Sequence, residues 1–129
     1  MFRNFYIQTA QGQERDALDD GSNLCAFYVS SVLTLFKKHT GVHGTVQSTV
    51  ADLRHSGWQQ VEETAMQPGD VIVWEVMEIN GGKYEHVGFY LGQRRAISTS
   101  WTKKKVVEHD VHFDGTRAIK YVFRCLDWE

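Results

Sequence analysis

The sequence of 129 residues has little cysteine, almost no proline and no long apolar run. Its two cysteines, Cys25 and Cys125, are a hundred positions apart, which excludes a disulfide framework and a paired-cysteine metal motif. No stretch approaches the ~18 consecutive apolar residues that a membrane helix requires. We therefore expect no membrane span, and no metal or other cofactor.

The sequence also lacks an excess of charge of one sign, because it has 14 Lys and Arg and 16 Asp and Glu. The formal net charge of -2 gives no bulk electrostatic reason to bind nucleic acid, so no nucleic-acid partner is expected. The N-terminal stretch "MFRNFYIQTAQGQ" has neither a continuous apolar core nor a small-residue cleavage site. No secretory signal is visible in the sequence, so we expect a protein that acts in the cytoplasm, is exported by a route other than the Sec pathway, or has been trimmed.

A helical first half and a strand-rich second half predict one domain over residues 1–129. The first helix is expected from Asn23 to about Lys38, capped by Asp20 or Ser22 and ended by Gly41. Its apolar positions cover nearly the whole circumference, which predicts a helix buried on all sides. These positions are Leu24, Phe27, Tyr28, Val29, Val32, Leu33, Leu35 and Phe36. A shorter helix is expected from Val46 to His55, before Gly57.

After the turn "MQPGD" the residue pattern becomes typical of β-strands. Strands are expected over Val71–Val76, His86–Leu91, Ala96–Trp101, Lys105–Phe113 and Ala118–Cys125. Helices followed by a meander of strands predict an α+β fold, with an N-terminal core helix packed on a small antiparallel sheet or half-barrel.

Cys25 lies near the start of the first predicted helix. The positive end of a helix dipole favours the thiolate over the thiol, and thiolates are the nucleophilic form of cysteine. The alternative is a cysteine that only fills the core, since free cysteine is among the most buried residue types. A residue that can act with Cys25 as a base is needed to favour the nucleophile interpretation over the core-filling one.

His86 in "YEHVGFYLG" is the strongest candidate for that partner. On a strand, His86, Gly88 and Tyr90 share one face, and the intervening apolar residues share the other. Gly88 indicates space beside the histidine, and if the first turn of the Cys25 helix fills it, His86 reaches the sulfur as a general base. The other histidines are assigned to ordinary backbone contacts by default: His39, His43, His55, His109 and His112.

The segments "LCAFYVSSVL", "MQPGDVIVW", "HVGFYLG" and "AISTS" occur in an order and spacing that resemble the NlpC-type branch of the papain-like cysteine peptidases. The similarity covers roughly residues 20–101, and "N-x-C-A-x-Y-V" is also similar to the CHAP amidases. The resemblance implies a papain-like fold, with Cys25 as nucleophile and His86 as general base. It further implies a third polar residue, about twelve positions after the histidine, that orients the imidazole.

That third position falls on Ser98. In a hairpin turning near Gly92, a three-residue loop places Ser98 or Ser100 on the His86 face, whereas a two-residue loop places Thr99 there. We prefer Ser98, although family members often have histidine at this position. Glu85 points to the face of the strand opposite His86 and is therefore a poor substitute for Ser98 as the orienting residue. The segment Glu108 to Asp110 offers orienting groups only if the following strand folds back over the site.

The neighbours of Cys25 differ from those of the cell-wall peptidases, which commonly have Asp before the cysteine and Ser-Gly after it. Here they are Leu24, Ala26 and Phe27, so the acid that holds a substrate amine is missing and the substrate-binding residues are not identified. The leading hypothesis is a cysteine hydrolase that cleaves an amide or peptide bond in peptidoglycan stem peptides. The alternatives are a weakly active or inactive binding module of the same fold, and a delivered amidase toxin with an immunity protein as partner.

Overall fold

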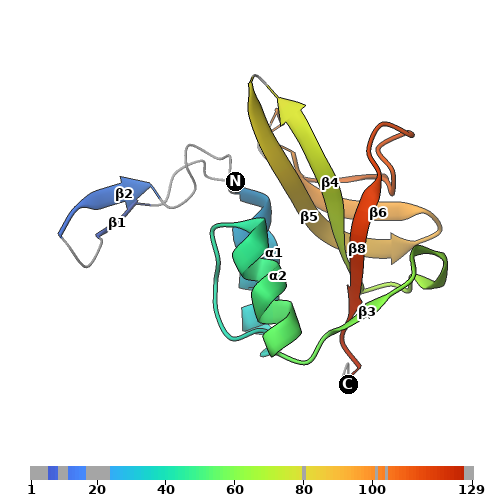
Figure 1. The fold of residues 1–129 in the computed structure, drawn as a ribbon, viewed down its shortest axis with the longest axis horizontal. Helices are drawn as coiled ribbons and strands as arrows, with labels where there is room; N and C mark the ends of the chain where they lie inside the picture. The colour runs from blue at the N-terminus through green and yellow to red at the C-terminus, as the bar shows by residue number, and fades with distance from the viewer. Residues whose placement is uncertain are drawn as a thin grey trace.

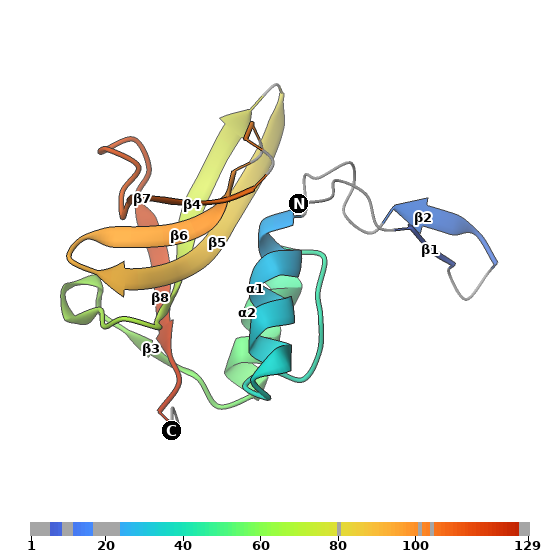
Figure 2. The ribbon, with the colours of Figure 1, turned by 180° about the vertical axis from the view of Figure 1, so that it is seen from behind.

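The computed structural model describes residues 6–8, 12–16, 24–79, 81–100, 102–103 and 105–126. Two short strands near the N-terminus, β1 (Tyr6–Gln8) and β2 (Glu14–Asp16), pair with each other in a separate two-stranded sheet. The helices α1 (Leu24–Leu35) and α2 (Val46–His55) lie side by side on one side of a six-stranded antiparallel sheet (Figures 1 and 2). The predicted α+β architecture is confirmed.

Helix α1 buries one face rather than its whole circumference. The buried positions are Leu24, Cys25, Ala26, Val29, Ser30 and Leu33. On the opposite side, Leu35 is 79% exposed, and Phe36, just past the helix, is 62% exposed. The prediction of a helix buried on all sides is wrong, because the sheet and α2 cover only part of α1; Tyr28 and Val32 are partly buried against the core, and Leu35 meets solvent.

The end of α1 comes at Leu35, three residues before the predicted end at Lys38. Lys37 takes the left-handed conformation, with φ of 59°, and the N–H of Lys38 donates to the carbonyl of Leu33 at 2.9 Å. This is the pattern that closes a helix through a left-handed residue. The predicted start at Asn23 and its caps, Asp20 and Ser22, lie outside the described residues.

Helix α2 has the predicted bounds, Val46–His55. The side chain of Thr45 caps it by accepting the N–H of Ser48 at 3.0 Å. At the other end, Ser56 is the C-cap, and Gly57 follows with φ of 87°. Periodicity and flanking residues were sufficient to predict this helix.

The large sheet has the strand order β3-β8-β4-β5-β6-β7. Its strands are β3 (Gln59–Val61), β4 (Val71–Ile79), β5 (Gly82–Gly92), β6 (Arg95–Ser100), β7 (Lys105–Asp110) and β8 (Ile119–Arg124). The five predicted strands are present, and β3 was not predicted. β7 ends at Asp110 rather than Phe113, because Phe113 and Asp114 both have positive φ, 53° and 58°, which a strand excludes.

The two faces of the sheet carry separate apolar clusters. The face toward the helices includes Val71 and Val73 of β4 with Val87 and Phe89 of β5, packed on α1 and α2. The other face carries a smaller cluster of buried residues, Ile72, Trp74, Ala96 and Val111. This alternation decides which side chains of β5 and β6 share a surface.

The "PGD" turn before β4 is held by hydrogen bonds at both ends. The N–H of Gly69, a residue with φ of 94°, donates to the carbonyl of Tyr90 at 2.9 Å. The buried Asp70 carboxylate accepts two hydrogen bonds from the Arg124 guanidinium, at 3.0 and 2.8 Å. The turn therefore joins the end of β5 to β8 and fixes where β4 begins.

No helix among the described residues is both long enough and apolar enough to cross a membrane.

Candidate functional site

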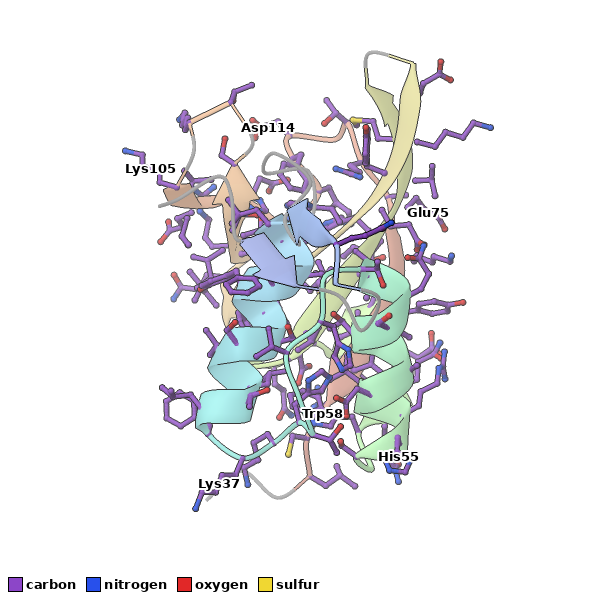
Figure 3. All side chains as sticks on the ribbon, turned by 90° about the vertical axis from the view of Figure 1, so that its left-hand side faces the viewer. Lys37, His55, Trp58, Glu75, Lys105 and Asp114 are labelled. Atoms are coloured by element: carbon purple, nitrogen blue, oxygen red, sulfur yellow. The ribbon has the colours of Figure 1, made fainter. Side chains whose placement is uncertain are left out.

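Cys25 lies in the first turn of α1, as the sequence predicted, and is only 7% exposed. The backbone N–H of Val87 donates a hydrogen bond to its sulfur, which places the sulfur against β5 one residue after His86. Figure 3 shows this end of α1 far from Lys37, which marks the other end of the helix. Cys25 and Cys125 are both free thiols, so neither is lost to a disulfide.

A pocket of about 230 Å³ opens over Cys25. It lies between the start of α1, the turn before α2 and the first residues of β5. Its lining residues are Cys25, Ala26, Gly44, Thr45, Val46, Gln47, Lys83, Tyr84 and Glu85. The pocket therefore offers space for a group of a few heavy atoms beside Cys25.

Burial raises the pKa of the Cys25 thiol, and this effect outweighs the hydrogen bonds from the backbone at Val87 and Ala26, which lower it. The expectation from the helix dipole alone, a lowered pKa, is therefore wrong for the free protein. The resting group is a thiol, and its activation requires a base.

His86 lies on the opposite face of β5 from Val87, with its ring centroid 5.5 Å from that of Trp74 and 5.8 Å from that of Phe113. Burial lowers the pKa of His86 to about 3, and the positive charge of Arg117 contributes to the shift. The imidazole is therefore neutral near pH 7, which is the form that accepts a proton.

Ser98 lies beside His86, with its Oγ 2.9 Å from His86 Nε2. The loop between β5 and β6 has two residues, Gln93 and Arg94, both with positive φ as in a type I′ turn. By loop length alone this turn would put Thr99 on the His86 face. A β-bulge at Leu91, between the pairs Tyr90↔Ala96 and Gly92↔Arg95, shifts the register and turns Ser98 toward His86 instead.

Gly88 provides space, but not for the Cys25 helix. A Cβ built on Gly88 would collide with the carbonyl oxygen of Ile97 and lie 2.8 Å from Ser98 Cβ and 3.1 Å from Trp74. The glycine therefore allows β6 and Trp74 to close around the His86–Ser98 contact. The condition under which we expected His86 to reach the sulfur, that α1 fills this space, is therefore not met, since the residue of β5 that packs on α1 is Val87.

Arg117, in the loop before β8, belongs to the site and was missed from the sequence. Its Nε donates to the carbonyl of Glu75 at 3.0 Å and its Nη2 to the carbonyl of Tyr84 at 2.6 Å. Its positive charge lowers the pKa of both Cys25 and His86. No local motif identified it, because strand pairing brings it to the site from the far end of the chain.

The segment Glu108 to Asp110 does fold back, as part of β7, which pairs with β6. His109 Nε2 lies 2.7 Å from Ser98 Oγ, on the side away from His86. Glu108 instead pairs with Arg95 at 3.1 Å on the surface. The carboxylate of Asp110 accepts the backbone N–H of His112 at 2.9 Å and so holds the next turn.

Glu85 is engaged elsewhere, as expected from its opposite orientation. Its carboxylate accepts hydrogen bonds from Gln47 at 2.8 Å and from Lys120 at 3.1 Å.

Among the described residues, one group has the composition of a metal site: His39, His43 and Asp52, whose ligand atoms lie within 4.8 Å of one another. The Asp52 carboxylate already accepts hydrogen bonds from His43, Thr40, Gly41 and Ser56. Although burial raises its pKa, those hydrogen bonds hold the net pKa of Asp52 well below its usual value. The group thus fastens the loop between α1 and α2 through hydrogen bonds, at the end of α1 away from Cys25.

The described residues supply a buried thiol that lines a pocket, a neutral imidazole in contact with a hydroxyl, and a guanidinium whose charge lowers the pKa of both the thiol and the imidazole. The structure brings Ser98 to His86, but among the described residues it shows no contact between Cys25 and His86. A thiol and a base that can accept its proton are the groups that nucleophilic acyl transfer uses.

The sequence model of the NlpC/P60 family matches residues 10–123, nearly the whole chain. No curated protein matches the chain.

Proposed function

The chain belongs to the NlpC/P60 family, whose members are generally cysteine peptidases or amidases of cell-wall peptides, and from this premise we propose that it hydrolyses an amide bond in a peptidoglycan stem peptide. In this proposal Cys25 is the nucleophile, His86 is the general base and Ser98 orients the imidazole. The supporting observation is the position of Cys25, which lines the pocket and whose sulfur accepts the N–H of Val87, the residue next to His86.

In the proposed reaction a substrate carbonyl enters the pocket beside the sulfur. His86 accepts the thiol proton as Cys25 attacks the carbonyl carbon, and this transfer requires Nδ1 and the sulfur to come within hydrogen-bond reach in the substrate complex. His86 then gives the proton to the leaving amine, which departs and leaves a thioester. Water attacks the thioester, the carboxylic acid is released, and the thiol regains its proton.

The start of α1 supplies groups for the developing oxyanion. The first N–H groups of a helix have no partner within the helix, and they point toward a ligand at its N-terminus. Arg117 adds a positive charge close to the sulfur. We propose that the N–H groups around Cys25 and the Arg117 guanidinium share the stabilisation of negative charge during attack.

The test is digestion of purified peptidoglycan and of defined stem peptides, with release of products followed by mass spectrometry. Wild type is expected to cleave, Cys25→Ala and His86→Asn to lose at least ~100-fold in rate, since nucleophile and base act as a unit. Cys125→Ser is the matched control, because it removes the chain's other thiol and should leave turnover unchanged. Turnover that persists in both Cys25→Ala and His86→Asn would sink the proposal.

A second function, a binding module that does not turn over its ligand, is favoured by the raised pKa of Cys25. In that case wild type and Cys25→Ala bind a stem peptide with the same affinity, and neither releases product. Calorimetric titration with the peptides used for digestion separates the two functions.

A further inference from the structure

His109 lies at the end of a chain of hydrogen bonds that leads to His86. Ser98 Oγ is 2.9 Å from His86 Nε2 and 2.7 Å from His109 Nε2, so one hydroxyl joins the two rings. On its other side, His109 Nδ1 lies 2.7 Å from the carbonyl oxygen of Asp110. All the groups are fixed by neighbouring strands, since β6 pairs with both β5 and β7.

The direction of every hydrogen bond in this chain follows from its end. A carbonyl oxygen only accepts, so His109 Nδ1 carries a proton. A neutral imidazole has one N–H, so His109 Nε2 accepts, and the Ser98 hydroxyl must donate to it. The Ser98 oxygen then accepts from His86, which places the His86 proton on Nε2 and leaves Nδ1 unprotonated.

The neutral form of His109 is supported by its surroundings. Burial is the largest influence and lowers its pKa, and the nearby Arg95 acts in the same direction. The carbonyl and carboxylate of Asp110 and the carboxylate of Asp114 act against them, and the net pKa remains below the usual value. His86, on β5 beyond the intervening β6, carries no positive charge near pH 7, because its own pKa is about 3.

We propose that His109 is a positioning residue that sets the tautomer of His86 through Ser98 and so keeps Nδ1 available as the base. The inference rests on the proposed function, because a general base is only needed if Cys25 is a nucleophile. Without an acceptor at position 109, the Ser98 hydroxyl turns its proton toward His86 Nε2. The His86 proton then moves to Nδ1, and the base is lost.

The same residue also has a packing contact, which a test must separate from the relay. The His109 ring is stacked on Phe113, with ring centroids 4.0 Å apart and planes 17° apart. His109→Phe keeps a flat ring for this stacking but removes the acceptor. His109→Gln loses the aromatic ring but keeps a carbonyl oxygen that can accept from Ser98.

The first readout is the tautomer of His86, measured by long-range proton–nitrogen NMR on protein with labelled histidine. We expect the Nε2–H form in wild type and in His109→Gln, and a shift to the Nδ1–H form in His109→Phe. An unchanged His86 tautomer in His109→Phe overturns the inference. Because this readout needs no substrate, it stands even if the proposed hydrolase activity is absent.

The second readout is the alkylation rate of Cys25 by iodoacetamide near pH 7, with Cys125→Ser as background. We expect His109→Phe to slow alkylation by about tenfold or more, since the Ser98 hydroxyl left without its acceptor then favours the wrong His86 tautomer. His109→Gln should stay within about threefold of wild type. The opposite ranking, with Gln slow and Phe fast, would mean that His109 acts only by stacking.

Non-additivity provides the last control. If His109 acts through Ser98, the change His109→Phe has no further effect on alkylation in a Ser98→Ala background, because both changes break one chain. Independent, multiplicative effects of the two changes contradict a relay.

Discussion

At the scale of single residues, Arg117 is a charged side chain that acts on the Cys25 thiol. It lowers the pKa of Cys25 against the larger effect of burial, and it also lowers the pKa of His86. The same cation therefore favours the nucleophilic form of the thiol and the neutral form of the base.

Replacing Arg117 by Gln should raise the pKa of Cys25 and slow its alkylation near pH 7 by roughly 3- to 10-fold, a shift of about half to one pKa unit. Arg117→Lys keeps the charge and should remain close to wild type. Arg94→Gln, in the exposed turn between β5 and β6, is the control for loss of an arginine elsewhere. Rates for Arg117→Gln equal to wild type would show that the charge does not reach the sulfur.

Gly88→Ala tests how closely β6 approaches His86. The new Cβ would collide with the Ile97 carbonyl and crowd Ser98 Cβ, and backbone cannot move aside as a flexible side chain can. We expect a loss of unfolding free energy of about 1–3 kcal/mol, typical of overpacking, together with a change in the His86 NMR signals. Urea unfolding measures the first effect. Gly41→Ala is the matched control, since a Cβ there meets nothing within 4 Å.

At the scale of elements, the helices and strands were largely predictable from periodicity and turn residues. Helix α2 and the strand carrying His86 follow directly from local pattern, and the position of Cys25 in the first turn of α1 follows from the apolar run behind it. What could not be predicted depends on pairing between strands. The bulge at Leu91 decides which face Ser98 occupies, and neither turn length nor residue type signals it.

The same limit explains the site residues that were missed or set aside. Arg117 and His109 come from the last third of the chain, and only the order β4-β5-β6-β7 with β8 beside β4 brings them near His86. His109 was assigned to a backbone contact by default and considered as an orienting group only if the strand after Ser98 folds back; it does make the backbone contact, to Asp110. Its second contact, to Ser98, depends on the β6–β7 register, which the sequence leaves open.

The end of α1 offers a test of stability. Lys37 takes a left-handed conformation that costs a residue with a side chain roughly 1 kcal/mol more than glycine. Lys37→Gly should therefore raise the unfolding free energy by about 0.5–1 kcal/mol, measured by urea unfolding. The neighbouring Lys38→Gly is the control, because Lys38 lacks a positive φ and should gain nothing. Equal effects at the two positions would contradict the role of the left-handed residue.

At the scale of the whole molecule, the buried neutral histidine links folding to pH. The folded-state pKa of His86 is about 3 and the ordinary value is 6.5, so below about pH 6.5 the unfolded chain binds a proton that the folded chain does not. Stability therefore rises with pH in this window and is lost as pH falls toward 3. Asp52, whose pKa is also lowered, acts only near and below its ordinary value of 3.8.

We expect wild type to lose up to about 2 kcal/mol of unfolding free energy between about pH 7 and 5 from His86 alone. His86→Asn should lose less unfolding free energy over this range. The loss that remains includes the contribution of His109, whose pKa is also lowered. The exposed His55→Asn is the matched control and should keep the wild-type dependence. Urea unfolding at a series of pH values measures the slope, and identical slopes for all three proteins would contradict the assignment.

The bulge at Leu91 also limits which insertions and deletions the β5–β6 hairpin can accept. Because side chains alternate along β6, removing or adding one residue in the β5–β6 hairpin exchanges odd and even positions of the whole strand, so that Thr99 replaces Ser98 beside His86. Removing two residues restores the alternation. Natural variants of this chain should therefore tolerate substitutions at Gln93 and Arg94 that permit a left-handed backbone, while single-codon insertions or deletions in this hairpin should be selected against.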